Sequence, residues 1–105
     1  MTPAEIIREM RALLFERGWC RHGLTNALDE LCLLGAHNVA TGMQADDEIA
    51  AYTQCFASGA ISALVEAVGC SGPYMLFIWQ DEIDRTFDEV IDLLDKAEKI
   101  AERAS

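Results

Sequence analysis

The glycine-bounded loop 18–23 brings together a thiol, a guanidinium and an imidazole, groups that nucleophilic catalysis uses. Cys20 and His22 are separated only by Arg21, a cation of the kind that lowers the pKa of a nearby thiol. A cysteine nucleophile also needs a base within hydrogen-bond reach. Asp81 would orient His22 if the segment around it folds against this loop. The residues therefore allow a thiol enzyme that uses Cys20 and His22, while an unreactive loop thiol is the simpler interpretation.

The spacing of the remaining Cys, His and acidic residues does not match known catalytic or metal-binding motifs. Cys32 and His37 lie five residues apart in one predicted helix, about 140° around its axis, so they point to different sides and form no dyad. The same geometry excludes a zinc site that combines them with the loop thiol. The acids between 81 and 92 lack the glycine of a calcium-binding loop. Glycine-rich phosphate loops and a Gly-x-Ser-x-Gly motif are absent. We expect no metal ion, no cofactor and no catalytic residue.

A second concentration of polar and aromatic groups begins at Trp79. Arg85 is the only cation between positions 23 and 95, so Asp81 or Asp84 in its own segment is the predicted partner. If this corner packs against the loop that carries Trp19, a small-ligand pocket rimmed by two guanidinium groups would form between them. The candidate binding residues are Trp19, Arg21, His22, Trp79, Asp81 and Arg85.

The two ends of the chain carry the clearest helix signals. Thr2 and Glu5 form a capping box that begins a helix over 3–17, and Thr86 and Glu89 form another that begins a helix over 86–104. The apolar residues of the second helix cover an arc of about 180°, in which Glu98 is the only charge. That arc is wider than one neighbour requires. We expect the helix to contact two neighbours, or one neighbour and a second subunit.

The middle of the chain predicts two further helices and a short apolar segment. One helix is expected over 25–41, and one over 47–68 that is apolar nearly all round, hence buried, with a possible kink at 58–59. The apolar segment 73–79 has no decisive periodicity, although the proline at its start favours helical turns. The sequence therefore predicts a single all-α domain, residues 1–105, built as a compact bundle of about four helices.

The charge distribution restricts the class of partner. The net charge is −10, and residues 24–95 carry thirteen acids and one arginine, a net −12. A chain without a basic stripe is unsuited to direct nucleic-acid binding. A membrane span over 60–79 is disfavoured by Glu66 and by the glycine- and proline-containing break at 69–73. We expect instead a protein partner with a basic surface.

Cysteine usage and the apolar residues predict location and assembly. The N-terminal apolar residues are interrupted by charges, and the four cysteines form no regular framework, so we expect a cytoplasmic protein with reduced thiols. Four short helices can hardly cover both the long buried helix and the wide arc of the last one, which predicts a homo-oligomer. The interface candidates are Phe15, Phe56, Ile61, Val65, Leu93 and Ile100.

Short motifs spread along the chain occur in a recognisable order. They are Gly18-Trp19, then Cys32-Leu33-Leu34-Gly35-Ala36, then Trp79-x-Asp81, Arg85-Thr86 and Glu89-Val90. This order resembles a small domain family of unknown function found in actinobacteria and their phages. The chain departs from that pattern at Gln80, where the family has Asn, and in a shorter segment before Cys32. The resemblance implies a phage-related protein, active in the host cytoplasm if phage-encoded, and transfers no catalytic residue.

Three functional hypotheses follow. The favoured one is a non-enzymatic protein-interaction domain, phage-encoded and acting on a host protein. The first alternative is a small-ligand-binding or sequestering protein with its pocket between the Trp19 loop and the Trp79 corner. The second alternative is the thiol enzyme that uses Cys20 and His22.

Overall fold

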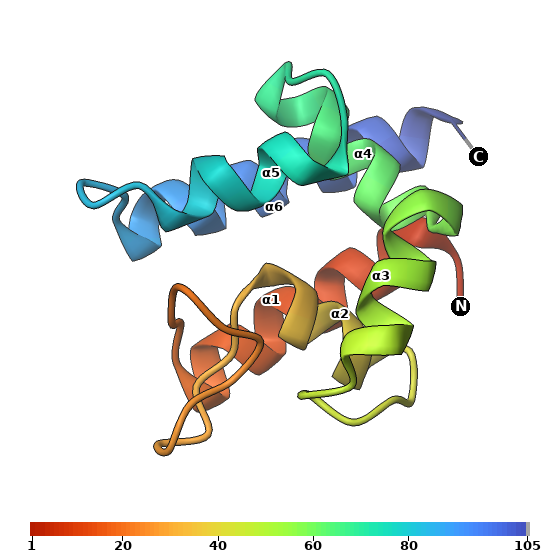
Figure 1. Ribbon diagram of the computed structural model, residues 1–105. Helices are drawn as coiled ribbons and strands as arrows, with labels where there is room; N and C mark the ends of the chain where they lie inside the picture. Colours follow the sequence, from red (N-terminus) through yellow and green to blue (C-terminus); the bar gives the residue numbers. More distant parts are fainter. Residues whose placement is uncertain (105) are drawn as a thin grey trace.

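The computed structural model describes residues 1–104, which form six α-helices (Figure 1). Ser105, the last residue of the predicted domain 1–105, lies outside the described residues. The helices are α1 (Pro3–Arg17), α2 (Leu33–Ala40), α3 (Glu48–Ala57), α4 (Gly59–Val68), α5 (Pro73–Asp81) and α6 (Phe87–Ala104). The all-α class is confirmed, whereas the expectation of about four helices is wrong for the part of the chain that the structure describes.

Helices α1 and α6 pack side by side in antiparallel orientation (Figure 1). Both begin with the capping boxes expected from the sequence, which involve Thr2 with Glu5 and Thr86 with Glu89. Arg8 on α1 pairs with Glu98 at 3.1 Å, and Arg11 pairs with the same carboxylate. Glu98, the one charge within the apolar arc of α6, is therefore explained by the two cations that α1 brings against it.

The core lies where α1, α4 and α6 meet. Its fully buried side chains include Ile7 and Leu14 from α1, Leu64 from α4, and Val90 and Leu94 from α6. The wide apolar arc of α6 is covered because this helix contacts α1 along one side and α4 along another. Two of the proposed interface residues, Ile61 and Leu93, are consequently enclosed within the single chain.

Residues 18–32 form an irregular loop where the first half of the helix 25–41 was expected. The side-chain oxygen of Asn26 accepts hydrogen bonds from the backbone N–H groups of Leu28 and Glu30, which competes with helix formation. Asp29 has a φ of 59°, a left-handed conformation that ends a helix. Leu28 in this loop is 77% exposed. The helix starts only at Leu33, with Cys32 as its N-cap.

A close approach of two backbones holds this loop against α2. The N–H of Cys32 donates to the carbonyl of Leu24 at 3.2 Å. A Cβ atom at Gly35 would overlap the same carbonyl oxygen. Only glycine at position 35 therefore lets the loop backbone lie directly on the first turn of the helix.

The long buried helix expected over 47–68 is two helices, broken at Ser58. Ser58 is extended, with φ −83° and ψ 127°, and its hydroxyl oxygen accepts from the N–H of Ile61, which caps α4. The break separates two environments. Helix α4 lies in the core, whereas α3 exposes Ile49, Tyr52 and Phe56. The prediction of burial is right for the second half and wrong for the first.

His37, predicted to point to a different side of its helix from Cys32, is fully buried beside this break. Its Nε2 lies 2.7 Å from the hydroxyl of Ser58, while its Nδ1 has no partner among the described residues. Burial lowers the pKa of His37 below its ordinary value. The neutral imidazole therefore ties α2 to the junction of α3 and α4.

The apolar segment 73–79 is helical and belongs to α5, which starts at Pro73. Among the described residues, no single helix is long and apolar enough to cross a membrane. Helices α4 and α5 meet the criteria of length and composition only as a pair, which is bent by 59°.

The close approach at Gly35 predicts a stability effect. Gly35→Ala should lower the free energy of unfolding by about 1–3 kcal/mol, the usual cost of overpacking, because the added methyl group must displace the Leu24 backbone. The control is Gly72→Ala, where the backbone is extended and the space around the Cβ is open. Urea denaturation of both variants measures the difference. Equal midpoints for the two variants would contradict the prediction.

Buried neutral His37 predicts a loss of stability in acid. The unfolded chain binds a proton near the ordinary histidine pKa of about 6.5, whereas the folded chain does so only at lower pH. The stabilisation is therefore complete above about pH 6.5 and falls below it, by up to about 1.4 kcal/mol per pH unit. Urea denaturation between pH 7.5 and 5 should show a shallower slope for His37→Asn.

Candidate functional site

The loop that carries Trp19 and the corner after Trp79 lie against each other. The Arg21 guanidinium donates from Nη1 to the backbone carbonyls of Glu82 at 2.8 Å and Ile83 at 2.9 Å. The backbone N–H of His22 donates to Oδ1 of Asp81 at 3.1 Å. We call the six residues Trp19, Arg21, His22, Trp79, Asp81 and Arg85 the loop–corner junction.

Arg85 is held inside the corner by contacts on all sides. Its guanidinium carbon lies 3.9 Å from the centroid of the Trp79 ring, and its Nε donates to the Trp79 carbonyl at 2.9 Å. Its two terminal nitrogens pair with Glu89 at 2.9 Å and Glu82 at 3.1 Å. The expectation of Asp81 or Asp84 as its partner is wrong. The side chain is only 13% exposed, so these contacts leave little of it for a ligand.

The junction is therefore filled by its own contacts. Arg21 lies 5.3 Å from the centroid of the Trp19 ring, which also stacks with Phe87 at 6.5 Å. Both guanidinium groups are already bonded to carbonyls or carboxylates. The pocket found next to the junction is bordered by Asp81, and neither arginine is among its lining residues.

The environment of Cys20 does not activate a nucleophile. The thiol is buried and donates to the carbonyls of Gly23 at 3.7 Å and Glu30 at 3.5 Å. Burial, followed by the nearby Cys32, Glu30 and Asp81, raises the pKa of Cys20 to about 11. Arg21, which would have lowered this pKa, points to the carbonyls of the corner instead. The thiol therefore stays protonated at neutral pH.

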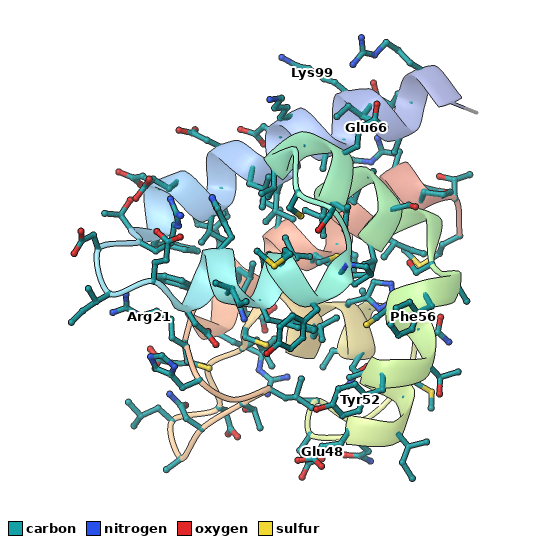
Figure 2. The ribbon with its side chains drawn as sticks, turned by 45° about the horizontal axis from the view of Figure 1, so that its top comes forward. Arg21, Glu48, Tyr52, Phe56, Glu66 and Lys99 are labelled. Carbon is teal, nitrogen blue, oxygen red and sulfur yellow. The ribbon has the colours of Figure 1, made fainter. Side chains whose placement is uncertain are left out.

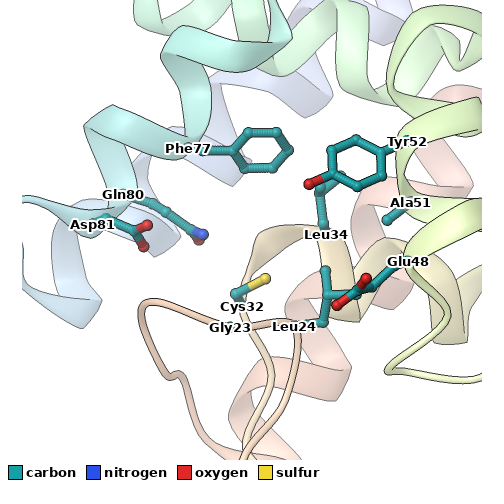
Figure 3. Close-up of a pocket in the computed structure, with 10 residues that line it drawn as sticks. All are labelled: Gly23, Leu24, Cys32, Leu34, Glu48, Ala51, Tyr52, Phe77, Gln80 and Asp81. Carbon is teal, nitrogen blue, oxygen red and sulfur yellow. The ribbon is translucent and has the colours of Figure 1, made fainter.

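A pocket of about 300 Å³ opens between the loop, α3 and α5 (Figure 3). Phe77 of α5 and Tyr52 of α3 lie on its two sides, and the thiol of Cys32 lies between the helices below them. Asp81 and Glu48 stand at opposite ends. The lining residues are Gly23, Leu24, Cys32, Leu34, Glu48, Ala51, Tyr52, Phe77, Gln80 and Asp81.

The polar groups in the depth of this pocket are already engaged. The Gln80 side chain is 3% exposed, and its oxygen accepts from the N–H of Leu33 at 3.0 Å. It also hydrogen-bonds Cys32, whose pKa burial raises. The thiol in turn accepts from the N–H of Gly35. The carboxylates of Asp81 and Glu48 are therefore the charged groups that a ligand would meet.

The motifs singled out in the sequence converge on this region. Of the motif residues, Trp19, Trp79, Asp81 and Arg85 belong to the loop–corner junction, and Cys32, Leu34, Gln80 and Asp81 line the pocket, whereas Val90 lies in the core. A model of a family of unknown function, DUF6197, matches residues 1–100. The chain belongs to this family. No curated protein and no solved structure matches the sequence.

For this DUF6197 member, the interface candidates fall into three groups. Phe15 is 63% exposed and makes an edge-to-face contact with Phe87, and Phe56 is 80% exposed. Val65 and Ile100 are half-buried. Ile61 and Leu93 lie in the core.

Among the described residues, no group of three or more His, Cys, Asp or Glu side chains is arranged to hold a metal ion.

Sequence reasoning missed Gln80, Glu48, Tyr52 and Phe77 as residues of one site. Gln80 follows Leu76 by four residues, so it lies on the buried stripe of α5, and a polar residue on such a stripe is a signal for a structural hydrogen bond. The other three come from α3 and α5, whose mutual position no local pattern specifies.

The pKa of Cys20 predicts slow alkylation. A pKa of about 11 in place of the reference 9.0 reduces the thiolate fraction at neutral pH about a hundredfold. Iodoacetamide at pH 7.5, followed by peptide mass spectrometry, should label Cys20 far more slowly in the folded protein than in urea. Labelling at equal rates in the two states would overturn the protonated, buried assignment and favour the thiol-enzyme alternative.

Proposed function

We propose that this protein is a non-enzymatic protein-interaction domain that binds a basic, apolar segment of a partner protein along the α3–α5 surface. We define this surface by Ile49, Tyr52 and Phe56 on α3, by Tyr74 and Ile78 on α5, and by the pocket between the helices. The observation that carries the proposal is the set of large apolar side chains that α3 leaves exposed beside this pocket.

Helix α3 presents one apolar face to solvent. Ile49, Tyr52 and Phe56 follow the spacing i, i+3, i+7 and are 80%, 66% and 80% exposed. The opposite face, with Ala50, Ala51 and Cys55, is buried. Figure 2 shows Tyr52 and Phe56 on this helix, away from Lys99 on α6. Contiguous exposed apolar side chains of this size are typical of interaction surfaces.

Helix α5 extends the apolar surface on the other side of the pocket. Tyr74 is 72% exposed and Ile78 44% exposed. Both belong to the same helical stripe as Asp81, which lines the pocket. A segment bound along the pocket would therefore meet aromatic and aliphatic side chains from both helices, the composition expected at the centre of an interface.

The negative charge near the α3–α5 surface determines which kind of partner segment we expect to bind there. Residues 24–95 carry a net charge of −12, and two of their acids, Glu48 and Asp81, stand at the ends of the pocket. A partner with a basic segment would be attracted electrostatically to these acids and would associate faster. The resemblance to a family found in actinobacteria and their phages supports a host protein as that partner, met in the host cytoplasm.

The same charge argues against a second copy of this chain as the occupant. Two α3–α5 surfaces placed face to face would oppose like charges. The apolar residues that favoured a homo-oligomer now lie in the core of one chain at Ile61 and Leu93. The homo-oligomer stays an untested expectation, and an assembly mass above 11.6 kDa by light scattering would favour it over our proposal.

The small-ligand hypothesis placed its pocket between the Trp19 loop and the Trp79 corner, a junction that its own contacts fill, but the neighbouring pocket between α3 and α5 is one observation in favour of a small ligand. Its volume of about 300 Å³ is at the lower end of the range for small-molecule sites. The exposed residues on either side extend well beyond such a ligand, which is why we favour a protein segment.

A designed peptide tests the proposal. A 15-residue amphipathic helix with Leu on one face and Lys on the other should bind with a Kd in the micromolar range, and added salt should weaken it. The double variant Ile49→Ser/Phe56→Ser should weaken binding at least about tenfold, because both side chains would be anchors. Fluorescence anisotropy of the labelled peptide measures both values.

Two controls separate this surface from general attraction to an acidic protein. Leu28→Ser removes a 77% exposed apolar side chain from the loop 18–32 and should leave the Kd unchanged. A peptide with Glu in place of every Lys should not bind. Equal loss of binding in Leu28→Ser and the double variant would contradict the α3–α5 assignment.

A further inference from the structure

We infer that the pocket between α3 and α5 binds an alkylammonium group, an ammonium ion on an apolar stem. On the proposed function, this group is a lysine side chain of the partner segment. The same chemistry is found in free aliphatic amines, so the test includes both sources.

The walls of the pocket fit an apolar stem. Phe77 and Tyr52 face it from opposite sides, and Leu24 and Leu34 complete the apolar lining (Figure 3). Aromatic faces also attract a cation held near them. The volume of about 300 Å³ is enough for a chain of several methylene groups with space for water around the charged end.

The charged groups left for a ligand are two carboxylates, and the hydroxyl of Tyr52 can also accept a hydrogen bond. Gln80 is engaged with Leu33 and Cys32, and burial keeps the Cys32 thiol protonated. Glu48 is exposed and makes no hydrogen bond or ion pair with the other described residues. Asp81 points into the pocket from the other end. With no cation in the lining, an anion would be repelled and a donor-rich cation attracted.

The position of Asp81 favours ammonium over guanidinium. Its Oδ1 already accepts the backbone N–H of His22 at 3.1 Å, and its Oδ2 lies 3.7 Å from the ring Nδ1 of the same residue, which together fix the carboxylate in place. A guanidinium fork prefers both oxygens of a carboxylate, whereas ammonium needs single contacts in any direction. The second carboxylate, Glu48, stands at the far end of the pocket, so the pair does not form a clamp around one planar group.

The first experiment titrates ¹⁵N-labelled protein with n-pentylamine and, as the uncharged match, 1-pentanol. Pentylamine should shift the amide signals of Leu24, Ala51 and Asp81. Its affinity should exceed that of pentanol at least about tenfold, because pentanol cannot make the charge-assisted hydrogen bond between ammonium and carboxylate. Asp81→Asn and Glu48→Gln should each reduce the affinity for pentylamine several-fold. Asn at position 81 can still accept from His22, which preserves the fold.

Glu66→Gln is the matched control. It removes one charge from α4, at the opposite end of the molecule from Glu48 in Figure 2, and should leave pentylamine binding unchanged. Equal binding of pentylamine and pentanol, or equal effects of Glu66→Gln and Asp81→Asn, would overturn the inference.

The second arm uses the Leu/Lys peptide and a version with Arg for every Lys, which keeps the charge. If lysine enters the pocket, the Arg peptide binds several-fold more weakly, and Asp81→Asn removes this difference. If the Lys and Arg peptides bind with equal affinity and pentylamine does not bind, the inference about the pocket is wrong and the proposed function is still supported. Pentylamine binding without peptide binding would support the pocket, with a free amine as its ligand, and overturn the proposed function.

Discussion

The buried side chain of Gln80 links α5 to the start of α2. Its oxygen accepts the N–H of Leu33, one of the unpaired backbone donors at the start of α2, and the same side chain hydrogen-bonds Cys32. Because Gln80 lies on α5, these bonds set the position of α5 over α2. The pocket, the loop–corner junction and the spacing between α3 and α5 all depend on that position.

The irregular backbone after α5 imposes a second constraint, because its carbonyl groups must be paired with hydrogen-bond donors. Carbonyl groups at the end of α5 and in the corner need donors, and the guanidinium groups of Arg21 and Arg85 supply them. Two cations that the sequence offered to a ligand are thus used to close the structure. What remains for a partner is negative and apolar. The junction that was expected to form a pocket rimmed by arginine is filled, and the pocket beside it is bounded by Asp81 and Glu48.

The contrast between α3 and α4 carries the functional argument. Both are short and mainly apolar, and the sequence joined them into one buried helix. Ser58 separates them by capping α4 and by bonding to the buried His37. Helix α4 then enters the core against α6, while α3 turns outward with three large apolar side chains exposed. Apolar content alone could not distinguish these environments, because burial depends on which elements surround a helix.

The sequence by itself determined the all-α class, the bounds of α1 and α6 to within a residue, and their capping boxes. These features depend on residues three or four apart, whose interactions are local. The packing of the Trp19 loop against the Trp79 corner was only a condition of two hypotheses from the sequence, and the structure shows this contact. Only the tertiary structure decided that Asn26 and Asp29 replace a helix by a loop, that Arg85 pairs with Glu82 and Glu89, and that Phe77, Tyr52 and Glu48 share a pocket. Those outcomes depend on long-range packing and on competition between hydrogen-bond partners, neither of which has a fixed sequence spacing.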